Sequence, residues 1–256
     1  EELAKQTKLS EYALKILLEA SLSAGTILIN KETDRYTISK TGWFLLNDPA
    51  TRVNIDFNHN VNYRGMYHLD EALMEGKPAG LKTLGDWPTI YEGLSKLEKQ
   101  VQDSWFSFDH FYSDHSFDKA LKIVFAKNPK HLMDVGGNTG RFALRCVEYD
   151  SNVNITIVDL PGQIGMMKEN IAGKEGAVRI DGFPTNILDE QNELPQGDWD
   201  AIWMSQFLDC FSEQEIYSIL SRAAKAMTAD TTLYIMETFW DRQKYEPASL
   251  CLTMTS

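Results

Sequence analysis

The sequence predicts an α/β fold with a mainly parallel sheet, preceded by a smaller and mostly helical N-terminal domain. From residue 131 to residue 237, apolar runs with strand character alternate with helical segments. This βαβ pattern is typical of a parallel sheet with right-handed crossovers. A chain of 256 residues has room for two domains. We expect them at residues 1–125 and 126–256.

The first 47 residues predict a helix, a turn, a second helix and a small β wing. Ser10 can cap the second helix, because its side chain can accept a hydrogen bond from the free N–H groups of the first turn. The strands of the wing are expected at 27–30 and 36–39. Four leucines at helical spacing predict one apolar face on the second helix: Leu14, Leu17, Leu18 and Leu22.

A winged helix suggests DNA binding, but the charge of this chain opposes that function. Residues 1–50 contain six Lys or Arg against seven Asp or Glu, and the whole chain has a net charge of −12. Nucleic acids and anionic membranes both favour clustered Lys and Arg. We therefore expect a structural or dimerising winged helix in a homodimer, with neither nucleic acid nor membrane as a partner.

The segment between the wing and the sheet is expected to be mostly helical, and it is rich in aromatic residues. Trp105, Phe106, Phe108, Phe111 and Tyr112 cannot share one face of a helix, because they wrap around it. A helix that is apolar on several faces must contact more than one neighbour. It either lies between domains or uses its second face to line a pocket.

The elements of the predicted sheet follow in order. Strands are expected at residues 131–135, 154–158, 177–180, 199–204 and 231–237. Helices are expected at residues 141–149, 162–171 and 213–227. Open α/β sheets bind ligands at the carboxyl ends of their strands, so the functional residues should follow these strands.

A glycine-rich turn after the first strand and an acid at the end of the second predict a nucleoside-cofactor site. Glycine allows positive φ and a close approach of the backbone to a ligand, and Asp159 can accept both ribose hydroxyls. The dinucleotide fingerprint requires a third glycine where this chain has Arg141, which disfavours an NAD-dependent dehydrogenase. The spacing, with Asn in place of the middle glycine, resembles the first motif of class I S-adenosylmethionine (SAM) methyltransferases: Asp134, Gly136, Asn138 and Gly140.

Longer motifs resemble the plant-type small-molecule O-methyltransferases, a family with many bacterial members. In the N-terminal part they are R-Y-T-I-S-K-T-G at 35–42, L-D-E-A-L-M-E-G-K-P-A at 69–79 and F-D-H-F-Y-S-D-H-S at 108–116. In the C-terminal part they are D-V-G-G-N-T-G at 134–140, V-D-L-P at 158–161 and D-A-I-W-M-S-Q-F-L-D-C-F-S-E-Q-E at 200–215. The resemblance implies a winged-helix dimerisation domain joined to a Rossmann-like class I methyltransferase sheet. It also implies methyl transfer from SAM to a hydroxyl of a small aromatic acceptor.

The resemblance assigns site residues by position. The implied cofactor contacts run from the methionine moiety through the ribose to the adenine: Asp134, Gly136, Asn138, Asp159, Leu160, Asn186, Ile187, Met204 and Ser205. The implied acceptor contacts come from the aromatic helix and from the end of the fourth strand: Trp105, Phe108, His110, Tyr112, His115 and Gln206.

The catalytic position departs from the family. The family uses a histidine as general base, and Asp209 stands there in this chain, with Glu237 matching the acid that orients the histidine. Three interpretations compete. Asp209 is itself the base, with its pKa raised by burial and by Glu237; His110 or His115 reaches in from the aromatic helix; or the protein binds SAM without methylating an alcohol. A structural role for Asp209, as a capping acid before the next helix, is the alternative to all three.

The remaining features concern the cellular environment and the two ends of the chain. Three scattered cysteines show neither metal-ligand spacing nor a disulfide framework, so we expect no metal and a reducing cytoplasm. No apolar run approaches the length of a membrane span. The chain begins without Met and stops at Ser256, soon after the fifth expected strand. We expect residues before Glu1, and the last two strands of the family's sheet, to lie outside it.

Overall fold

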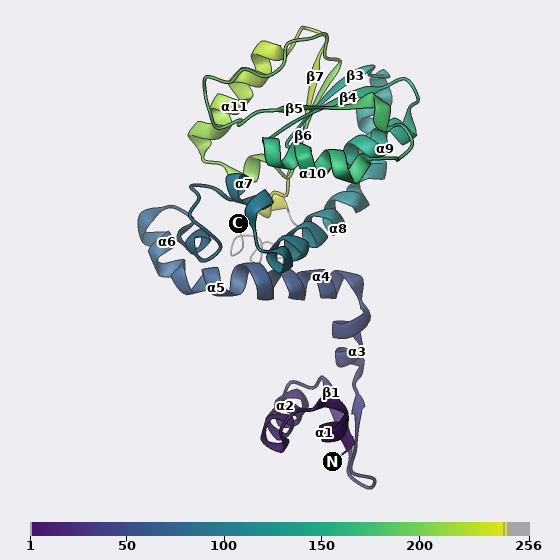
Figure 1. Cartoon of the computed structure of the whole chain (residues 1–256), viewed down its shortest axis with the longest axis vertical. Coiled ribbons are helices and arrows are strands. Elements are labelled where there is room, and N and C mark those ends of the chain that lie inside the picture. Colours follow the sequence, from purple (N-terminus) through teal and green to yellow (C-terminus); the bar gives the residue numbers. More distant parts are fainter. Residues whose placement is uncertain (1, 243, 245–256) are drawn as a thin grey trace. The chain divides into compact units, whose positions relative to one another are not determined.

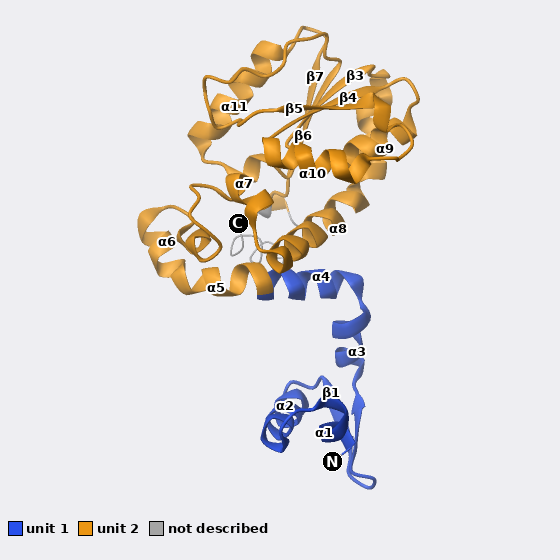
Figure 2. Ribbon diagram, viewed as in Figure 1, with its two compact units in different colours: residues 1–59 blue, residues 60–256 orange. Residues whose placement is uncertain are grey.

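The computed structural model describes residues 2–242 and residue 244. Contacts within the chain divide it into two compact units, residues 1–59 (unit 1) and residues 60–256 (unit 2) (Figure 2). The domain boundary that the sequence suggested, between residues 125 and 126, falls inside unit 2 and stays a prediction.

Unit 1 contains the expected helices and wing. Its elements are α1 (Glu2–Thr7), α2 (Glu11–Ser23), β1 (Ile27–Asn30), β2 (Arg35–Ile38), α3 (Lys40–Asn47) and α4 (Pro49–Phe57). Ser10 caps α2 as predicted, because its Oγ accepts a hydrogen bond of 3.2 Å from the N–H of Ala13. The two strands pair in antiparallel fashion, with Ile27 opposite Ile38.

Most apolar side chains of unit 1 are exposed. Among its described residues, the buried ones are Ser39, Gly42 and Phe57. The predicted leucine face of α2 is only partly correct: Leu14, Leu18 and Leu22 are half-buried, whereas Leu17 is 53% exposed. An apolar surface of this extent is characteristic of a region that is covered by a partner.

The helical part of unit 2 precedes the sheet. Its α-helices are α5 (Tyr63–Gly65), α6 (Leu69–Glu75), α7 (Ile90–Gly93) and α8 (Lys99–Val124). The aromatic segment forms one long helix, α8, as expected. Phe106 and Phe117 are buried while Tyr112 is 42% exposed, so its aromatic residues point to several sides.

The sheet of unit 2 has five parallel strands in the order β5-β4-β3-β6-β7 (Figure 1). The strands are β3 (His131–Val135), β4 (Asn154–Asp159), β5 (Ile180–Pro184), β6 (Ala201–Ser205) and β7 (Thr232–Met236). The helices that follow strands are α9 (Arg141–Tyr149), α10 (Pro161–Ile171) and α11 (Glu213–Ala226). The α/β fold with a mainly parallel sheet is thereby confirmed.

Helices cover both faces of this sheet. Leu132, Ile157 and Trp203 point to one face, where they pack with buried residues of α8, α9 and α10. Met133 and Met204, each adjacent in sequence to one of these, point to the other face and pack with α11. Successive side chains of a strand alternate between faces, and here both faces are apolar, as expected of a parallel sheet in the middle layer of three.

The strand expected at residues 177–180 was wrong. Residues Ala177–Arg179 form a 3-10 helix and the strand begins at Ile180. The guanidinium of Arg179 fixes this turn, because it donates hydrogen bonds to the carbonyls of Val147, Asp150 and Val153. Gly182 and Pro184, which lie in β5, are residues typical of turns and concealed the strand.

No helix in residues 2–242 is both long enough and apolar enough to cross a lipid bilayer.

A buried arginine ties the loop after β5 to α11. Arg222 is 4% exposed and its guanidinium donates to the carbonyls of Ile187, Asp189 and Asn192. We expect Arg222→Met to lower the free energy of unfolding by about 3 kcal/mol, because one buried and two partly buried hydrogen bonds from the guanidinium are lost. Urea denaturation measures this. Arg145→Met is the control and should cost less than about 1 kcal/mol, since its ion pairs with Asp118 and Glu148 are exposed. Equal losses would contradict the assignment.

Candidate functional site

The site lies where the strand order of the sheet reverses, between β3 and β6. In open α/β sheets ligands bind at such a point, outside the carboxyl ends of the strands. A cavity of about 80 Å³ occurs there. Four parts of unit 2 line it: α8 with Asp109, His110, Ser113 and Phe117; β3 and the following loop with residues 134 and 136–139; the start of α9 with Arg141 and Phe142; and β6 and its end with Trp203, Ser205 and Gln206.

The glycine loop after β3 has the backbone that the sequence predicted. Gly136 has φ of 75° and Gly140 has φ of 76°, a conformation that glycine adopts without strain. A Cβ at Gly136 would also lie 2.2 Å from the ring of Phe207. Asn138, in place of the family's middle glycine, has φ of 48°, which Asn tolerates better than most residues. Its side-chain oxygen accepts a hydrogen bond of 2.8 Å from the amide of Gln163.

Asp159 ends β4 and is bonded to the glycine loop. It is 3% exposed. One carboxylate oxygen accepts a hydrogen bond of 2.9 Å from the N–H of Asn138, and the other accepts one of 2.7 Å from the N–H of Leu160. Burial raises the pKa of Asp159 to about 6 despite these bonds. Each oxygen retains a lone pair, so the carboxylate can still accept a hydroxyl of a ribose.

Asp134 ends β3 and borders the cavity. It is 2% exposed, and its Oδ2 has no hydrogen-bond partner among the described residues. Burial raises the pKa of Asp134 to about 8, with a smaller contribution from the charge of Asp159. The unpartnered Oδ2 can therefore accept a hydrogen bond from a ligand.

The residues predicted beside the adenine already have partners on α7. The side-chain amide of Asn186 donates to Glu92 Oε1 at 3.4 Å, and the N–H of Ile187 donates to the hydroxyl of Tyr91. Tyr91 is 4% exposed and packs edge-on against the rings of Phe207 and Phe211. Sequence reasoning gave neither α7 residue a role.

The predicted catalytic acids lie at the ends of β6 and β7. Glu237 Oε1 accepts hydrogen bonds from the N–H groups of Phe207 and Leu208, at 3.0 and 2.9 Å, so Glu237 fixes the short turn that carries Asp209. The second oxygen, Oε2, is buried without a partner. Burial, followed by the charge of Asp209, raises the pKa of Glu237 to about 7. Asp209 is an exposed residue, yet desolvation of its carboxyl by the surrounding protein raises its pKa too.

Asp209 does not cap the following helix, so that alternative was wrong. Ser212 is the N-cap of α11: its Oγ accepts from the N–H of Glu215 at 3.4 Å, and Glu215 accepts in return from the N–H of Ser212 at 2.7 Å. This reciprocal capping box satisfies the helix start without Asp209.

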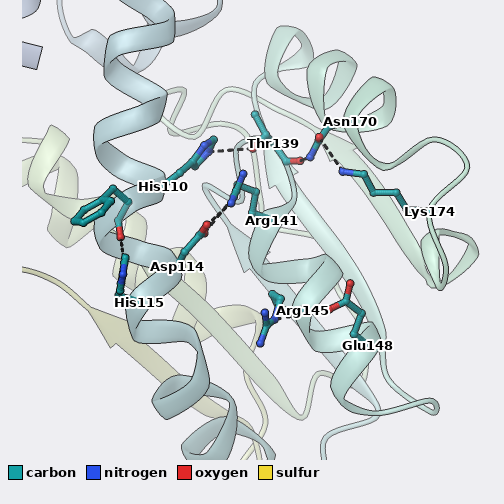
Figure 3. Close-up of polar contacts among 10 residues, drawn as sticks. His110, Asp114, His115, Thr139, Arg141, Arg145, Glu148, Asn170 and Lys174 are labelled. Atoms are coloured by element: carbon teal, nitrogen blue, oxygen red, sulfur yellow. Dashed lines mark hydrogen bonds and ion pairs between the residues drawn. The ribbon is translucent and has the colours of Figure 1, made fainter. Parts of the chain in front are cut away.

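The two histidines of α8 differ in environment (Figure 3). His110 borders the cavity, and its Nε2 lies 3.3 Å from the hydroxyl of Thr139. Burial, followed by the charge of Arg141, lowers the pKa of His110 to about 4, which makes it a neutral and weak base. Arg141 itself forms an ion pair with Asp114 (Figure 3). His115 is exposed and its Nδ1 bonds to the carbonyl of Phe111.

The structure brings together some of the predicted site residues and leaves others apart. Those that border the cavity are Asp134, Gly136, Asn138, Ser205, His110 and Gln206. Those that do not border it are Asp159, Leu160, Asn186, Ile187, Met204, Trp105, Phe108, Tyr112, His115, Asp209 and Glu237. Met204 is fully buried in the core beside α11. The roles assigned to both groups stay predictions.

Sequence reasoning missed Asp109, which borders the cavity beside His110. Asp109, Ser113 and Phe117 are four residues apart and lie on one stripe of α8. That spacing was visible in the sequence, but the aromatic residues between them dominated the pattern. Gln206, predicted as an acceptor contact, has a strained backbone with φ of 47°, and such strain is often found at functional sites.

The fold and this cleft define a class I methyltransferase-type α/β domain, with a glycine loop and strand-end acid at the switch point. Comparison with protein families is consistent with that class. The O-methyltransferase domain family matches residues 67–254, and the Dimerisation2-like domain matches residues 1–36. The chain therefore belongs to the O-methyltransferase family.

Individual relatives are distant. Demethylspheroidene O-methyltransferase of Rhodobacter capsulatus is 22% identical over 92% of this chain and 56% of its own length. The 3-hydroxy-5-methyl-1-naphthoate 3-O-methyltransferase of Streptomyces sahachiroi is 28% identical over 48% of this chain and 35% of its own length. The chain thus spans about half of the first relative and about a third of the second. A solved structure, PigF with SAH, matches with a TM-score of 0.78 at 17% identity, over 99% of this chain and 76% of that one.

The raised pKa of Asp134 predicts how stability depends on pH. The carboxyl keeps its proton up to about pH 8 in the folded protein and loses it near pH 4 in the unfolded chain. The folded state therefore binds more protons between these values, so the contribution of Asp134 to stability falls as the pH rises through this range. Asp134→Asn removes this dependence. Between about pH 5 and pH 8 the melting temperature of the Asp134→Asn variant should fall less than that of the wild type, as measured by scanning calorimetry.

Asp150→Asn is the control for this measurement. Asp150 is half-buried, and the N–H of Asn152 lowers its pKa, so it is ionised throughout this pH range in both states. The Asp150→Asn substitution should leave the pH dependence of the melting temperature as it is in the wild type. The same slope in Asp134→Asn and in the wild type would show that Asp134 ionises normally in the folded protein.

Proposed function

We propose that this chain binds SAM and transfers its methyl group to a hydroxyl of a small aromatic acceptor. The single observation that carries the proposal is the hydrogen bond that joins the glycine loop after β3 to Asp159, the acid at the end of β4. Asn138 N–H and the Asp159 carboxylate join the two segments that a nucleoside cofactor needs, at the switch point of the sheet. Membership of the O-methyltransferase family gives the reaction class. It disfavours the alternative of a SAM-binding protein without this activity.

The residues of the cleft fit SAM, which carries a sulfonium and an ammonium group. Asp109 and Asp134 border the cavity, and Arg141, which also borders it, is already paired with Asp114. The unpartnered Oδ2 of Asp134 can accept a hydrogen bond from a cationic donor. An excess of acid over base at a buried site therefore suits a positively charged ligand. When bound, SAM supplies an electrophilic methyl group.

The remainder of the cofactor would lie outside the cavity of about 80 Å³, which is small beside the roughly 300–1,000 Å³ of typical ligand sites. We assign the ribose to Asp159 and the adenine to Leu160, Asn186 and Ile187. The hydroxyl of Tyr91 is bonded to the N–H of Ile187, and the carboxylate of Glu92 to the side-chain amide of Asn186. In our proposal the adenine takes over these bonds.

The proposed general base is the carboxyl at the family's histidine position, Asp209. A base must accept the proton of the acceptor hydroxyl, which typically contributes 10²–10⁴-fold to the rate. A carboxylate is suited to this only when its pKa is raised, and the surroundings of Asp209 raise it. Glu237 acts as a positioning residue, because it holds the N–H groups of the turn that carries Asp209.

The proposed partners are a small acceptor and a second copy of the chain. The relative from Streptomyces sahachiroi is named for a hydroxylated naphthoate, which agrees with a flat aromatic acceptor. The match to a Dimerisation2-like domain and the exposed apolar residues of unit 1 support a homodimer. The net charge of −12 supports the expectation of no nucleic-acid or membrane partner, and a cytoplasmic location stays a prediction.

Cofactor binding is tested with S-adenosylhomocysteine (SAH), which should raise the melting temperature because it binds only the folded state. NAD at the same concentration should not. Asp159→Ala should remove most of the shift, since the ribose loses its acceptor. Asp181→Ala, which removes an exposed acid from the neighbouring strand β5, should keep it. Unchanged SAH affinity in Asp159→Ala would mean that the cofactor site is elsewhere.

The homodimer is tested by light scattering at micromolar concentration, where the wild type should have the mass of two chains. Leu17→Glu places a charge on the exposed apolar surface of α2 and should shift the mass toward the monomer. Val178→Glu is the control, because Val178 is 98% exposed and belongs to unit 2. A wild-type monomer would contradict the proposed assembly.

A further inference from the structure

Glu92 of α7 contacts Asn186 at the edge of the sheet to which we assign the adenine. Asn186 follows β5 closely. Pro184 of that strand lies opposite Asp159 of β4, and the N–H of Thr185 donates a hydrogen bond of 2.8 Å to the carbonyl of Asp159. A base whose ribose is bound by Asp159 therefore lies beside the segment that contains Asn186, which Glu92 reaches from α7.

The backbone fixes the direction in which the side-chain amide of Asn186 points. Its Oδ1 accepts a hydrogen bond of 3.0 Å from the N–H of Leu188. A backbone N–H can only donate, so this contact assigns the oxygen of Asn186 to the side of Leu188. The NH2 group is left for the side of Glu92, where it donates to Oε1 at 3.4 Å. Toward α7, Asn186 therefore presents a donor and no acceptor.

The acceptor at this edge is the carboxylate of Glu92, which is half-buried. One oxygen, Oε1, is bonded to Asn186, and the other, Oε2, accepts no hydrogen bond among the described residues. Nor does Glu92 take part in an ion pair within the part of the chain that the structure describes. Its second oxygen can therefore accept a hydrogen bond from an N–H group of a ligand.

Two adjacent contacts join α7 to the loop after β5. The hydroxyl of Tyr91 accepts from the N–H of Ile187, and the carboxylate of Glu92 accepts from the side chain of Asn186. The two segments thus place a backbone donor, Ile187 N–H, next to a carboxylate acceptor. Adenine has the complementary pattern along one edge, because its ring nitrogen N1 accepts and its 6-amino group donates. A 6-oxo base has the reverse pattern and would meet repulsion at both positions.

We propose that Glu92 is a cofactor-binding residue that selects adenine: its carboxylate accepts a hydrogen bond from the 6-amino group, while the N–H of Ile187 donates to N1. This inference rests on the proposed function, which assigns the adenine to this edge. A hydrogen bond to a carboxylate is charge-assisted and stronger than one between neutral groups. The helical part that precedes the sheet therefore contributes to recognition of the base, and Asn186 holds Glu92 in place for this role.

The first test compares SAH with its purine analogue, which has hydrogen in place of the 6-amino group and keeps N1. In titration calorimetry the wild-type chain should bind SAH about tenfold or more tightly than the purine analogue, because only SAH can donate to the carboxylate. Glu92→Leu should bind the two ligands with affinities that differ less than about twofold. Glu190→Leu is the control: it removes an exposed acid from the loop after β5 and should keep the wild-type preference.

The second test uses Glu92→Gln, which keeps the size of the side chain. The amide of Asn186 should donate to the remaining carbonyl oxygen, so the NH2 group that replaces Oε2 points to the base and can donate to a 6-oxo group. Compared with the wild type, this variant should bind SAH about tenfold more weakly and S-inosylhomocysteine, the 6-oxo analogue, about tenfold more tightly. A residue that only supports the fold would change both affinities in the same direction.

These outcomes separate the inference from the proposed function. Equal affinity of the wild type for SAH and the purine analogue overturns the inference, and so does a preference for SAH that persists in Glu92→Leu. If Glu92→Leu fails to fold, Glu92→Gln decides, and wild-type selectivity in that variant overturns the inference as well. A wild-type chain that binds none of the three ligands contradicts the proposed function instead.

Discussion

The hydrogen bond between the N–H of Asn138 and the carboxylate of Asp159 is the contact on which the rest of the site depends. It joins the loop after β3 to the end of β4, so two neighbouring strands present their ends as one surface. The loop can reach Asp159 only because Asn138 adopts positive φ, with Gly136 and Gly140 doing the same on either side. Gln163, which is 1% exposed, then holds the side chain of Asn138 from α10. Asn in place of glycine at this position therefore adds a bond that glycine could not make.

The sequence predicted the parts of the molecule in which local pattern and burial agree. β3 and α9 begin and end where expected, because a buried apolar run and an amphipathic helix flank a glycine turn that leaves little choice of boundary. β5 was misplaced because its packing against α10 requires Gly182. A Cβ there would lie 2.7 Å from Ile164. The tertiary requirement thus puts a residue of low strand propensity into a strand.

The site was predicted less completely than the fold, for a related reason. Asp134, Gly136 and Asn138 belong to one short motif, and the chain itself holds them together. Asp109 reaches the cavity only because α8 packs on the sheet, and Tyr91 meets Ile187 only through α7. Contacts between residues distant in sequence depend on tertiary packing, which periodicity and spacing do not report. The exposed Leu17 is a similar case, because periodicity identifies an apolar face but not which of its members a single chain buries.

The substitution of the family's histidine by Asp209 changes the electrostatics that a base requires. A neutral imidazole gains a charge when it takes a proton, and an acid beside it, at the position of Glu237, stabilises that charge. A carboxylate loses its charge when it takes a proton, so an adjacent acid instead raises its affinity for the proton. Beside Asp209, burial together with the repulsion between the two acids raises the pKa of Glu237 itself. A lone Asp in water would be too weak a base at neutral pH. In our proposal the desolvation of the Asp209 carboxyl, which raises its pKa, corrects this without a histidine.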